Sequence, residues 1–142
     1  MSNKRINGYF LRVSEEGEHF KGYIAEFEDT LKYLQGYVGG CIDVVMLNDD
    51  IDLVINDCGK IDNLPANRVY LDAEGIAVDF ICGNILCLRH DDEGDFDSIL
   101  ESDIPEIEKS LKPLLHVSAI GDKTIFIMTN TDNLPEYEET DK

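Results

Sequence analysis

The sequence has few basic residues, and this shortage sets the first limit on its function. Twelve lysines and arginines stand against 30 aspartates and glutamates in 142 residues, which gives a formal net charge of −18. Proteins bind phosphate backbones and anionic membrane surfaces through clustered cations. The composition therefore argues against direct binding to DNA, RNA or an anionic membrane.

The sequence also lacks a long apolar run. A membrane-spanning helix needs about 20 consecutive apolar residues, and no stretch of this chain approaches that length. The N-terminus, MSNKRINGYF, has no apolar core of the kind found in a signal peptide. We therefore expect a cytoplasmic protein.

Motifs for metal binding and catalysis are absent as well. No cysteine lies in a C-x-x-C pair or has a histidine at zinc-ligand spacing, so we expect reduced and mostly buried thiols at Cys41, Cys58, Cys82 and Cys87. The acidic run from Asp91 does not fit a calcium loop of the EF-hand type, because Phe96 stands where glycine is required. No serine-hydrolase, zinc-protease or phosphate-loop pattern is present. We predict no catalytic residues, no metal site, no cofactor and no enzymatic activity.

What the sequence does contain is a set of short strands around one helix. Leu31, Leu34 and Val38 share a helical face, Asp29 or Thr30 caps the start, and Gly39-Gly40 ends it. Strands are expected at residues 8–14, 19–27, 41–47, 51–57, 68–72, 76–82, 85–89, 117–120 and 123–129. Gly83-Asn84 and Gly121-Asp122 are typical hairpin turns.

These elements predict an α+β fold: a mostly antiparallel sheet with one helix at about 30–38 packed on it. Short acidic helices are expected near 96–111, at Phe96–Glu101 and Pro105–Leu111. Residues 1–130 should form a single domain, and residues 131–142 an acidic, disordered tail. Asp79, the one acid inside a strongly apolar strand, is expected to face solvent.

One polar loop carries a candidate ligand site. Two cations and two amides flank Gly59 and Pro65, and this combination suits an anionic ligand: Asn56, Lys60, Asn67 and Arg68. The alternative is structural, with the amides satisfying loop backbone groups and Arg68 paired with an acid.

Residues 91–108 form a second candidate, an acidic segment without a single base. Its nine acids are Asp91, Asp92, Glu93, Asp95, Asp97, Glu101, Asp103, Glu106 and Glu108. The segment is either a solvated face or a surface that presents carboxylates where a duplex presents phosphates. Charge alone does not separate these two interpretations.

The stretch from Leu31 to Arg68 resembles a family of uncharacterised small domains found in phages, prophages and integrative conjugative elements. The shared pattern, LQ-x-x-V-G-G-x-I-[ED]-V-V followed by N, G-K and L-P-x-N-R, is matched at Leu34-Gln35, Val38–Gly40, Ile42–Val45, Asn56, Gly59-Lys60 and Leu64–Arg68, with a later apolar strand ending at Gly83. The N-terminal hairpin is longer than the family pattern, and the acidic segment and last hairpin fall outside it. The resemblance implies a mobile-element origin and no known enzymatic activity.

Two functions are therefore expected. The leading one is a non-enzymatic accessory protein that binds and inhibits a host defence or nucleic-acid-binding protein, such as a restriction or CRISPR-type effector, through its acidic segment. The alternative is a small-ligand protein that sequesters a nucleotide signal at the Asn56–Arg68 loop. Homo-oligomer formation, which would complete that loop site across an interface, is left open.

Overall fold

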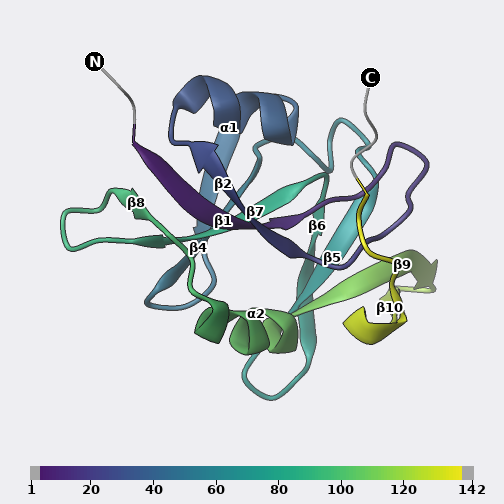
Figure 1. Cartoon of the computed structure of the whole chain (residues 1–142). Helices are drawn as coiled ribbons and strands as arrows, with labels where there is room; N and C mark the ends of the chain where they lie inside the picture. Colours follow the sequence, from purple (N-terminus) through teal and green to yellow (C-terminus); the bar gives the residue numbers. More distant parts are fainter. Residues whose placement is uncertain (1–3, 139–142) are drawn as a thin grey trace.

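The computed structural model describes residues 4–138, and in them ten strands form two antiparallel sheets accompanied by two α-helices (Figure 1). The first sheet has the order β2-β1-β7-β4-β3, and β8 adds to β7. Its strands are β1 (Arg5–Leu11), β2 (Tyr23–Glu28), β3 (Ile42–Met46), β4 (Ile51–Asn56), β7 (Ile85–His90) and β8 (Phe96–Asp97). The chain thus has the expected α+β character with mostly antiparallel strands.

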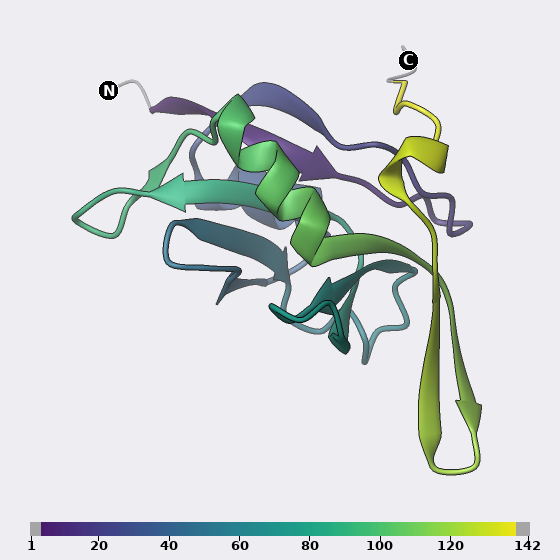
Figure 2. The same cartoon turned by 90° about the horizontal axis from the view of Figure 1, so that it is seen from below.

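The second sheet has the order β10-β9-β5-β6. Its strands are β5 (Ala66–Leu71), β6 (Ala77–Cys82), β9 (Leu111–Ile120) and β10 (Lys123–Met128). β9 and β10 form a long hairpin that projects from the rest of the molecule (Figure 2). The helical segments are α1 (Leu31–Val38), α2 (Ile104–Ser110), and the 3-10 turns η1 (Glu101–Asp103) and η2 (Thr131–Asn133).

Helix α1 begins and ends where its capping residues predict. The Thr30 side chain accepts a hydrogen bond from the Tyr33 N–H, at 3.1 Å. Gly39 adopts the left-handed conformation at the C-cap, with φ of 82°. Leu34, Tyr37 and Val38 of α1 pack against the first sheet. The capping residues therefore fix the ends of the helix, and its apolar face fixes where it packs.

The first sheet is buried on both faces. On one face, Phe10, Val54 and Leu86 pack with α1 in one apolar cluster. On the other, Leu53 and Cys87 pack with Ile107 of α2 and Leu111 of β9. Neighbouring strand residues point to opposite faces, so the central strands β4 and β7 are apolar on both.

The strands around Gly83-Asn84 do not form the predicted hairpin. β6 pairs with β5 in the second sheet, whereas β7 pairs with β1 and β4 in the first. Asn84 fixes the connection between the two sheets, because its side chain accepts a hydrogen bond from the Val13 N–H and donates one to the Tyr37 carbonyl. Both strands are apolar, and apolarity alone does not select a partner strand.

The predicted helix at Phe96–Glu101 is wrong. Phe96 and Asp97 form β8, which pairs with Arg89 and His90 of β7. The Ser98 hydroxyl then accepts a hydrogen bond from the Asn7 N–H, which keeps the chain extended along β1. The Ser98 N–H also donates to Asp97 Oδ1 at 2.8 Å. Local side-chain bonds of this kind compete with helix formation, and regular helix starts at Ile104.

The described part of the predicted tail, residues 131–138, contacts the rest of the chain. Leu134 is buried, and the Pro135 carbonyl accepts a hydrogen bond from the Lys21 N–H at 2.9 Å. The Tyr137 ring stacks on Tyr23, with centroids 5.5 Å apart. These apolar groups anchor an otherwise polar segment; residues 139–142, which the same prediction covers, lie outside the described residues.

Gly22 provides a test of the packing around Tyr9. A Cβ at Gly22 would overlap the Tyr9 ring, and that ring is held because its hydroxyl donates to Glu108 Oε2 at 2.8 Å. Gly22→Ala should therefore lower the free energy of unfolding by about 1–3 kcal/mol, as overpacked cores do.

Gly36→Ala is the matched control, measured by urea unfolding in the same buffer. Its added Cβ meets no atom within 4 Å, and alanine in a helix is favoured over glycine by about 0.5–1 kcal/mol. Equal stability of the two variants would contradict the tight contact at Gly22.

Candidate functional site

Exposed acids from separate parts of the chain gather at one end of the first sheet. β4 pairs with β7 so that Ile51 lies opposite Arg89, which brings the β3–β4 turn beside the β7–β8 hairpin. Asp97 lies opposite the same Arg89 on the other side. We name the exposed carboxylates of this region the acidic end: Asp49, Asp50, Asp92, Glu93, Asp95, Asp97 and Glu101.

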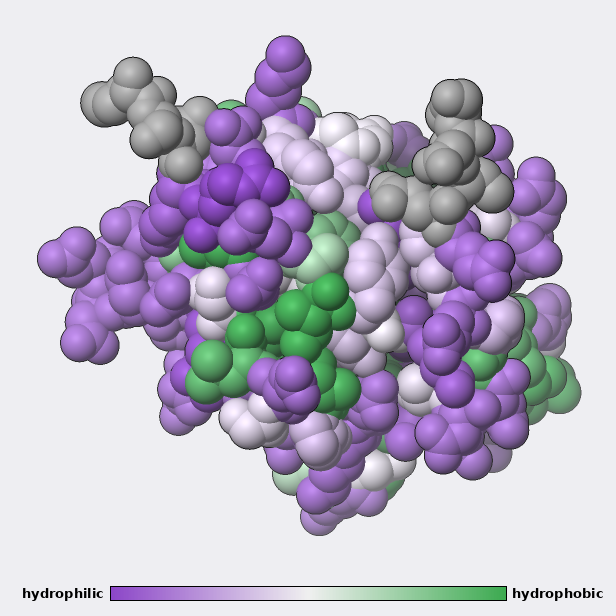
Figure 3. All heavy atoms as spheres, in the orientation of Figure 1, coloured by the Kyte–Doolittle hydropathy of each residue, from purple (hydrophilic) through white to green (hydrophobic). Residues whose placement is uncertain are grey.

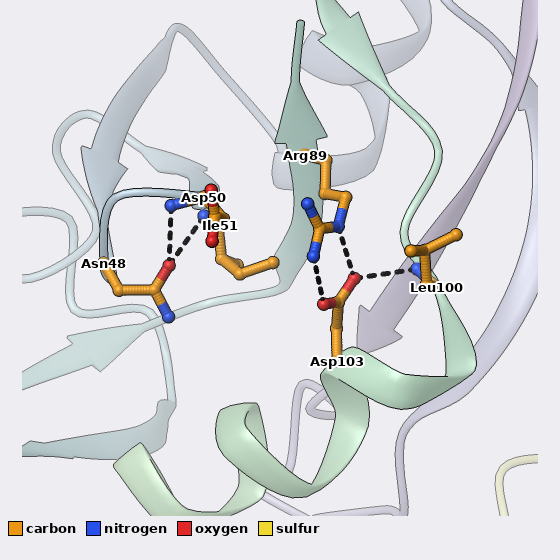
Figure 4. A network of polar contacts seen from close by, with 6 residues as sticks. All are labelled: Asn48, Asp50, Ile51, Arg89, Leu100 and Asp103. Carbon is orange, nitrogen blue, oxygen red and sulfur yellow. Dashed lines mark hydrogen bonds and ion pairs between the residues drawn. The ribbon is translucent and has the colours of Figure 1, made fainter.

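The two turns that carry most of these acids are fixed by side-chain hydrogen bonds. Asp91 Oδ1 accepts from the N–H groups of Glu93 and Asp95, at 2.9 and 3.0 Å. Asn48 Oδ1 accepts from the N–H groups of Asp50 and Ile51, at 2.8 and 2.9 Å (Figure 4). The carboxylates of the acidic end thus stand on ordered turns.

Asp103 does not belong to this surface, although the sequence placed it there. It is buried in a bidentate ion pair, with Arg89 Nε at 2.8 Å from Oδ2 and Arg89 Nη2 at 2.7 Å from Oδ1 (Figure 4). The Leu100 N–H donates to the same Oδ2. The hydrogen bond from Arg89 holds the Asp103 pKa below its usual value. Asp103 therefore connects η1 to β7. Because Arg89 is engaged in this pair, it does not pair with the exposed acids of the acidic end.

Two more of the predicted acids have structural contacts. Glu108 is half-buried and accepts the hydrogen bond from Tyr9, whose pKa burial raises well above its usual value. Asp91 is half-buried and holds its own turn. Glu106 is exposed on α2.

Hydrophilic residues cover the side of the molecule that carries the β7–β8 hairpin, on the left of Figure 3. Lys4, Arg89 and His90 lie near this region, and each has a partner; His90 Nδ1 lies 3.1 Å from Asp52 Oδ2. Arg89 pairs with Asp103, and the Lys4 ammonium donates to the Phe96 carbonyl at 2.6 Å. The region therefore keeps a strongly negative character.

The second predicted site is not assembled, because its four residues do not converge. Asn67 is fully buried, and its amide donates to the carbonyls of Leu11 and Gly83, at 2.9 and 2.8 Å. Asn56 is buried at the end of α1, where its amide donates to the Val38 carbonyl and its Oδ1 accepts from the Cys58 N–H. Both amides satisfy backbone groups, which is the structural alternative.

Arg68 is also buried, at 1% exposure. Its guanidinium donates to Asn67 Oδ1 at 2.8 Å and to the Phe20 carbonyl at 3.0 Å. Burial lowers its pKa. Within residues 4–138, Arg68 forms no ion pair; its guanidinium contacts amide and carbonyl oxygens in place of the predicted acid.

Lys60 is the one candidate of the four that lies at an open surface. Its ammonium pairs with Asp79, which is exposed as expected, and lies 4.3 Å from the Phe80 ring centroid. Both residues border a groove of about 390 Å³ between the β3–β4 hairpin and β6. Its apolar lining includes Val45, Met46, Ile55, Ile61, Tyr70 and Phe80, and its acids are Asp43, Asp57 and Asp79.

A family model with the description "Domain of unknown function (DUF3846)" matches residues 6–112. The chain belongs to the DUF3846 family. No curated protein and no solved structure matches the chain. The matched range contains the first sheet, both α-helices and the acidic end, while most of the β9–β10 hairpin lies beyond it.

In the described part of this DUF3846 chain, no three His, Cys, Asp or Glu side chains are grouped to hold a metal ion. Cys41 and Cys58 are exposed, and Cys82 and Cys87 are buried; all four are free thiols. Burial raises the pKa of Cys87 to about 12, which leaves this thiol unreactive at neutral pH. Residues 4–138 contain no helix of the length and apolarity needed to cross a bilayer.

Asp49 and Asp50 are the functional candidates in this DUF3846 domain that the sequence prediction missed. The Asn-Asp-Asp turn is visible in the sequence. The pairing of β4 with β7, which carries this turn to the β7–β8 hairpin, is not a local feature of the chain. Two runs of acids in turns that bound apolar strands are the signal that could have pointed to them.

Proposed function

We propose that this DUF3846 protein is a non-enzymatic accessory protein of a phage or other mobile element. It acts in the cytoplasm of the host cell and inhibits a host defence or nucleic-acid-binding protein. The acidic end binds the cationic surface with which that target holds its nucleic acid. The DUF3846 chain itself does not bind nucleic acid or membrane.

The observation that carries this proposal is the fixed arrangement of the acidic end. A duplex presents one negative charge per ~1.7 Å of its axis on a stiff scaffold, so a competitor needs carboxylates at defined positions. Here two hydrogen-bonded turns lie side by side and carry Asp49, Asp50, Asp92, Glu93 and Asp95. Arg89, which lies opposite Ile51 and Asp97 at this end of the sheet, is paired with Asp103.

The alternative function, sequestration of a nucleotide signal, has less support. Asn56, Asn67 and Arg68 are occupied by internal contacts. The groove at Lys60 is lined by three acids, and phosphate groups would be repelled there.

The test is a charge-neutral variant of the acidic end, D49N/D50N/D92N/E93Q/D95N. Asp91 and Asp103 stay unchanged because they hold the local structure. The immobilised wild-type protein is expected to capture nucleic-acid-binding proteins from a bacterial lysate at low salt, and added duplex DNA should release them. The variant should capture at least about tenfold less protein, because it lacks the carboxylates that would pair with the cations of the target.

The matched control removes the same number of exposed acids elsewhere, as E15Q/E16Q/E18Q/E74Q/D122N. It changes net charge equally and should keep capture within about twofold, since rim charges far from a contact contribute little. If the two variants lost capture equally, the effect would come from net charge and not from the acidic end. Capture that duplex DNA does not displace would contradict competition for a nucleic-acid site.

A further inference from the structure

Arg12, directly after β1, is half-buried among aromatic side chains. Its guanidinium carbon lies within 6.0 Å of four ring centroids, those of Phe10, Tyr23, Tyr37 and Tyr137. The shortest of these distances is 4.8 Å, to Tyr137. The Arg12 Nε also donates a hydrogen bond to the Tyr23 hydroxyl, at 2.6 Å. Rings from β1, β2, α1 and the C-terminal segment therefore hold this guanidinium in place.

The charge of Arg12 has no acid partner in residues 4–138, although the chain contains 30 acids. Arg5 and Arg89, by contrast, form ion pairs with Glu26 and Asp103. The two Nη nitrogens of Arg12 form no hydrogen bond within the same residues. Every enclosed side-chain nitrogen there has a partner, so these two nitrogens reach solvent and remain available as donors.

Arg12 borders a cleft of about 640 Å³ against one face of α1. We name it the Arg12 cleft. Lys32, the second cation of its lining, is exposed and forms no ion pair in the described part of the chain. The lining has one acid, Glu28. In a chain with a net charge of −18, the cleft is thus a place where cations outnumber acids.

The donors around the cleft suit a phosphate group. The Arg12 guanidinium is a planar fork that can bind two oxygens at once, and the Lys32 ammonium carries a further charge. Thr30, also in the lining, accepts the Tyr33 N–H through Oγ1, which leaves its hydroxyl hydrogen to donate. A phosphate monoester presents three acceptor oxygens and about −1.5 to −2 charges at pH 7. A carboxylate, with two oxygens and one charge, would use fewer of these donors.

We infer that the Arg12 cleft binds the phosphate group of a small phosphorylated molecule. The Arg12 Nη nitrogens donate to two phosphate oxygens, and Lys32 balances the second charge. Because the rings and Tyr23 already hold the guanidinium, binding costs little side-chain freedom. The cleft contains no acid of the acidic end and no residue of the Asn56–Arg68 loop. The inference therefore goes beyond the proposed inhibition, and either can fail without the other.

The test is isothermal titration calorimetry of the full chain with inorganic phosphate, glucose 6-phosphate, adenosine monophosphate and acetate. Salt at 0.1 M limits the repulsion from distant acids, because the Debye length is then about 10 Å. At least one phosphate probe should bind with a Kd below about 1 mM, and acetate at least about tenfold more weakly. Tighter binding of an ester would identify a phosphate ester as the ligand, and equal affinities would identify free phosphate.

Arg12→Met should raise the Kd at least about tenfold, and Arg12→Lys should have a smaller effect because it keeps the charge without the planar fork. Circular dichroism checks that both variants fold. Lys32→Met, at an exposed position that leaves the rings unchanged, should raise the Kd at least about threefold. The matched control is Arg5→Met, which removes the same charge from β1 outside the cleft lining and should stay within about twofold of the wild type.

Three results would overturn the inference. A wild type that binds none of the phosphate probes would leave Arg12 as a packing residue for the four rings. Acetate binding as tight as phosphate binding would contradict phosphate recognition. Equal Kd values for Arg12→Met, Lys32→Met and Arg5→Met would mean that the probes respond to net charge and not to this cleft.

Discussion

Asn67→Ala is expected to lower the free energy of unfolding by about 3–5 kcal/mol. The Asn67 amide is fully buried and bonds the carbonyls of Leu11 and Gly83, while its oxygen accepts from Arg68. Each buried group left without a partner costs about 1–3 kcal/mol, and more when the group is charged. Alanine would remove the donor of two carbonyls and one acceptor of the Arg68 guanidinium at once.

The effect should be specific to this amide. Asn7→Ala, at an exposed position of β1, is the control and should stay within about 0.5 kcal/mol of the wild type. Both are measured by urea unfolding at neutral pH. A cost for Asn67→Ala near that of the control would mean that Asn67 is not the link between β1, β5 and Gly83.

Arg68→Met extends this test to the buried charge. Methionine removes the charge that lacks a carboxylate partner, and such replacements of buried charges are often neutral or stabilising when the shape is kept. The double variant N67A/R68M should therefore lose less stability than the two single losses added together. Strict additivity would indicate that the two side chains do not act as one unit.

Asp103→Ala is the second large expected effect, a loss of about 3 kcal/mol at neutral pH. Removing one partner of a buried ion pair leaves the other charge uncompensated, and here the Leu100 N–H loses its acceptor as well. Arg89 is 31% exposed and regains some hydration, which places the expected loss at the lower end of the range for such pairs. Asp92→Ala, at an exposed acid of the same region, should change stability by less than about 0.5 kcal/mol.

The effect of Asp103→Ala should depend on pH with a defined sign. Arg89 lowers the Asp103 pKa in the folded state, and the unfolded value is about 3.9. The contribution of the pair is therefore fully present above the unfolded pKa and is lost as pH falls through the folded pKa. Urea unfolding at pH 7 and near pH 3 should show the difference between wild type and variant shrinking in acid. A difference that grows in acid would contradict the ion pair.

Local features of the sequence were enough to predict several elements. Thr30 and Gly39 mark the limits of α1, and Gly121-Asp122 marks the β9–β10 turn. The sequence was also enough to predict the net charge and the exposure of Asp79. Capping, turn conformation and strand alternation depend on neighbours within a few residues, and the order of the residues therefore determines them.

Only the tertiary structure decided which strands pair and which polar side chains are buried. The separation of β6 and β7 into two sheets, the burial of Asp103 and the internal bonds of Asn67 all depend on which strands pair. The same pairing carries Asp49 and Asp50 to the β7–β8 hairpin and so builds the acidic end. Apolar strands of similar length are interchangeable in sequence, and the choice between them rests on contacts between residues far apart in the chain.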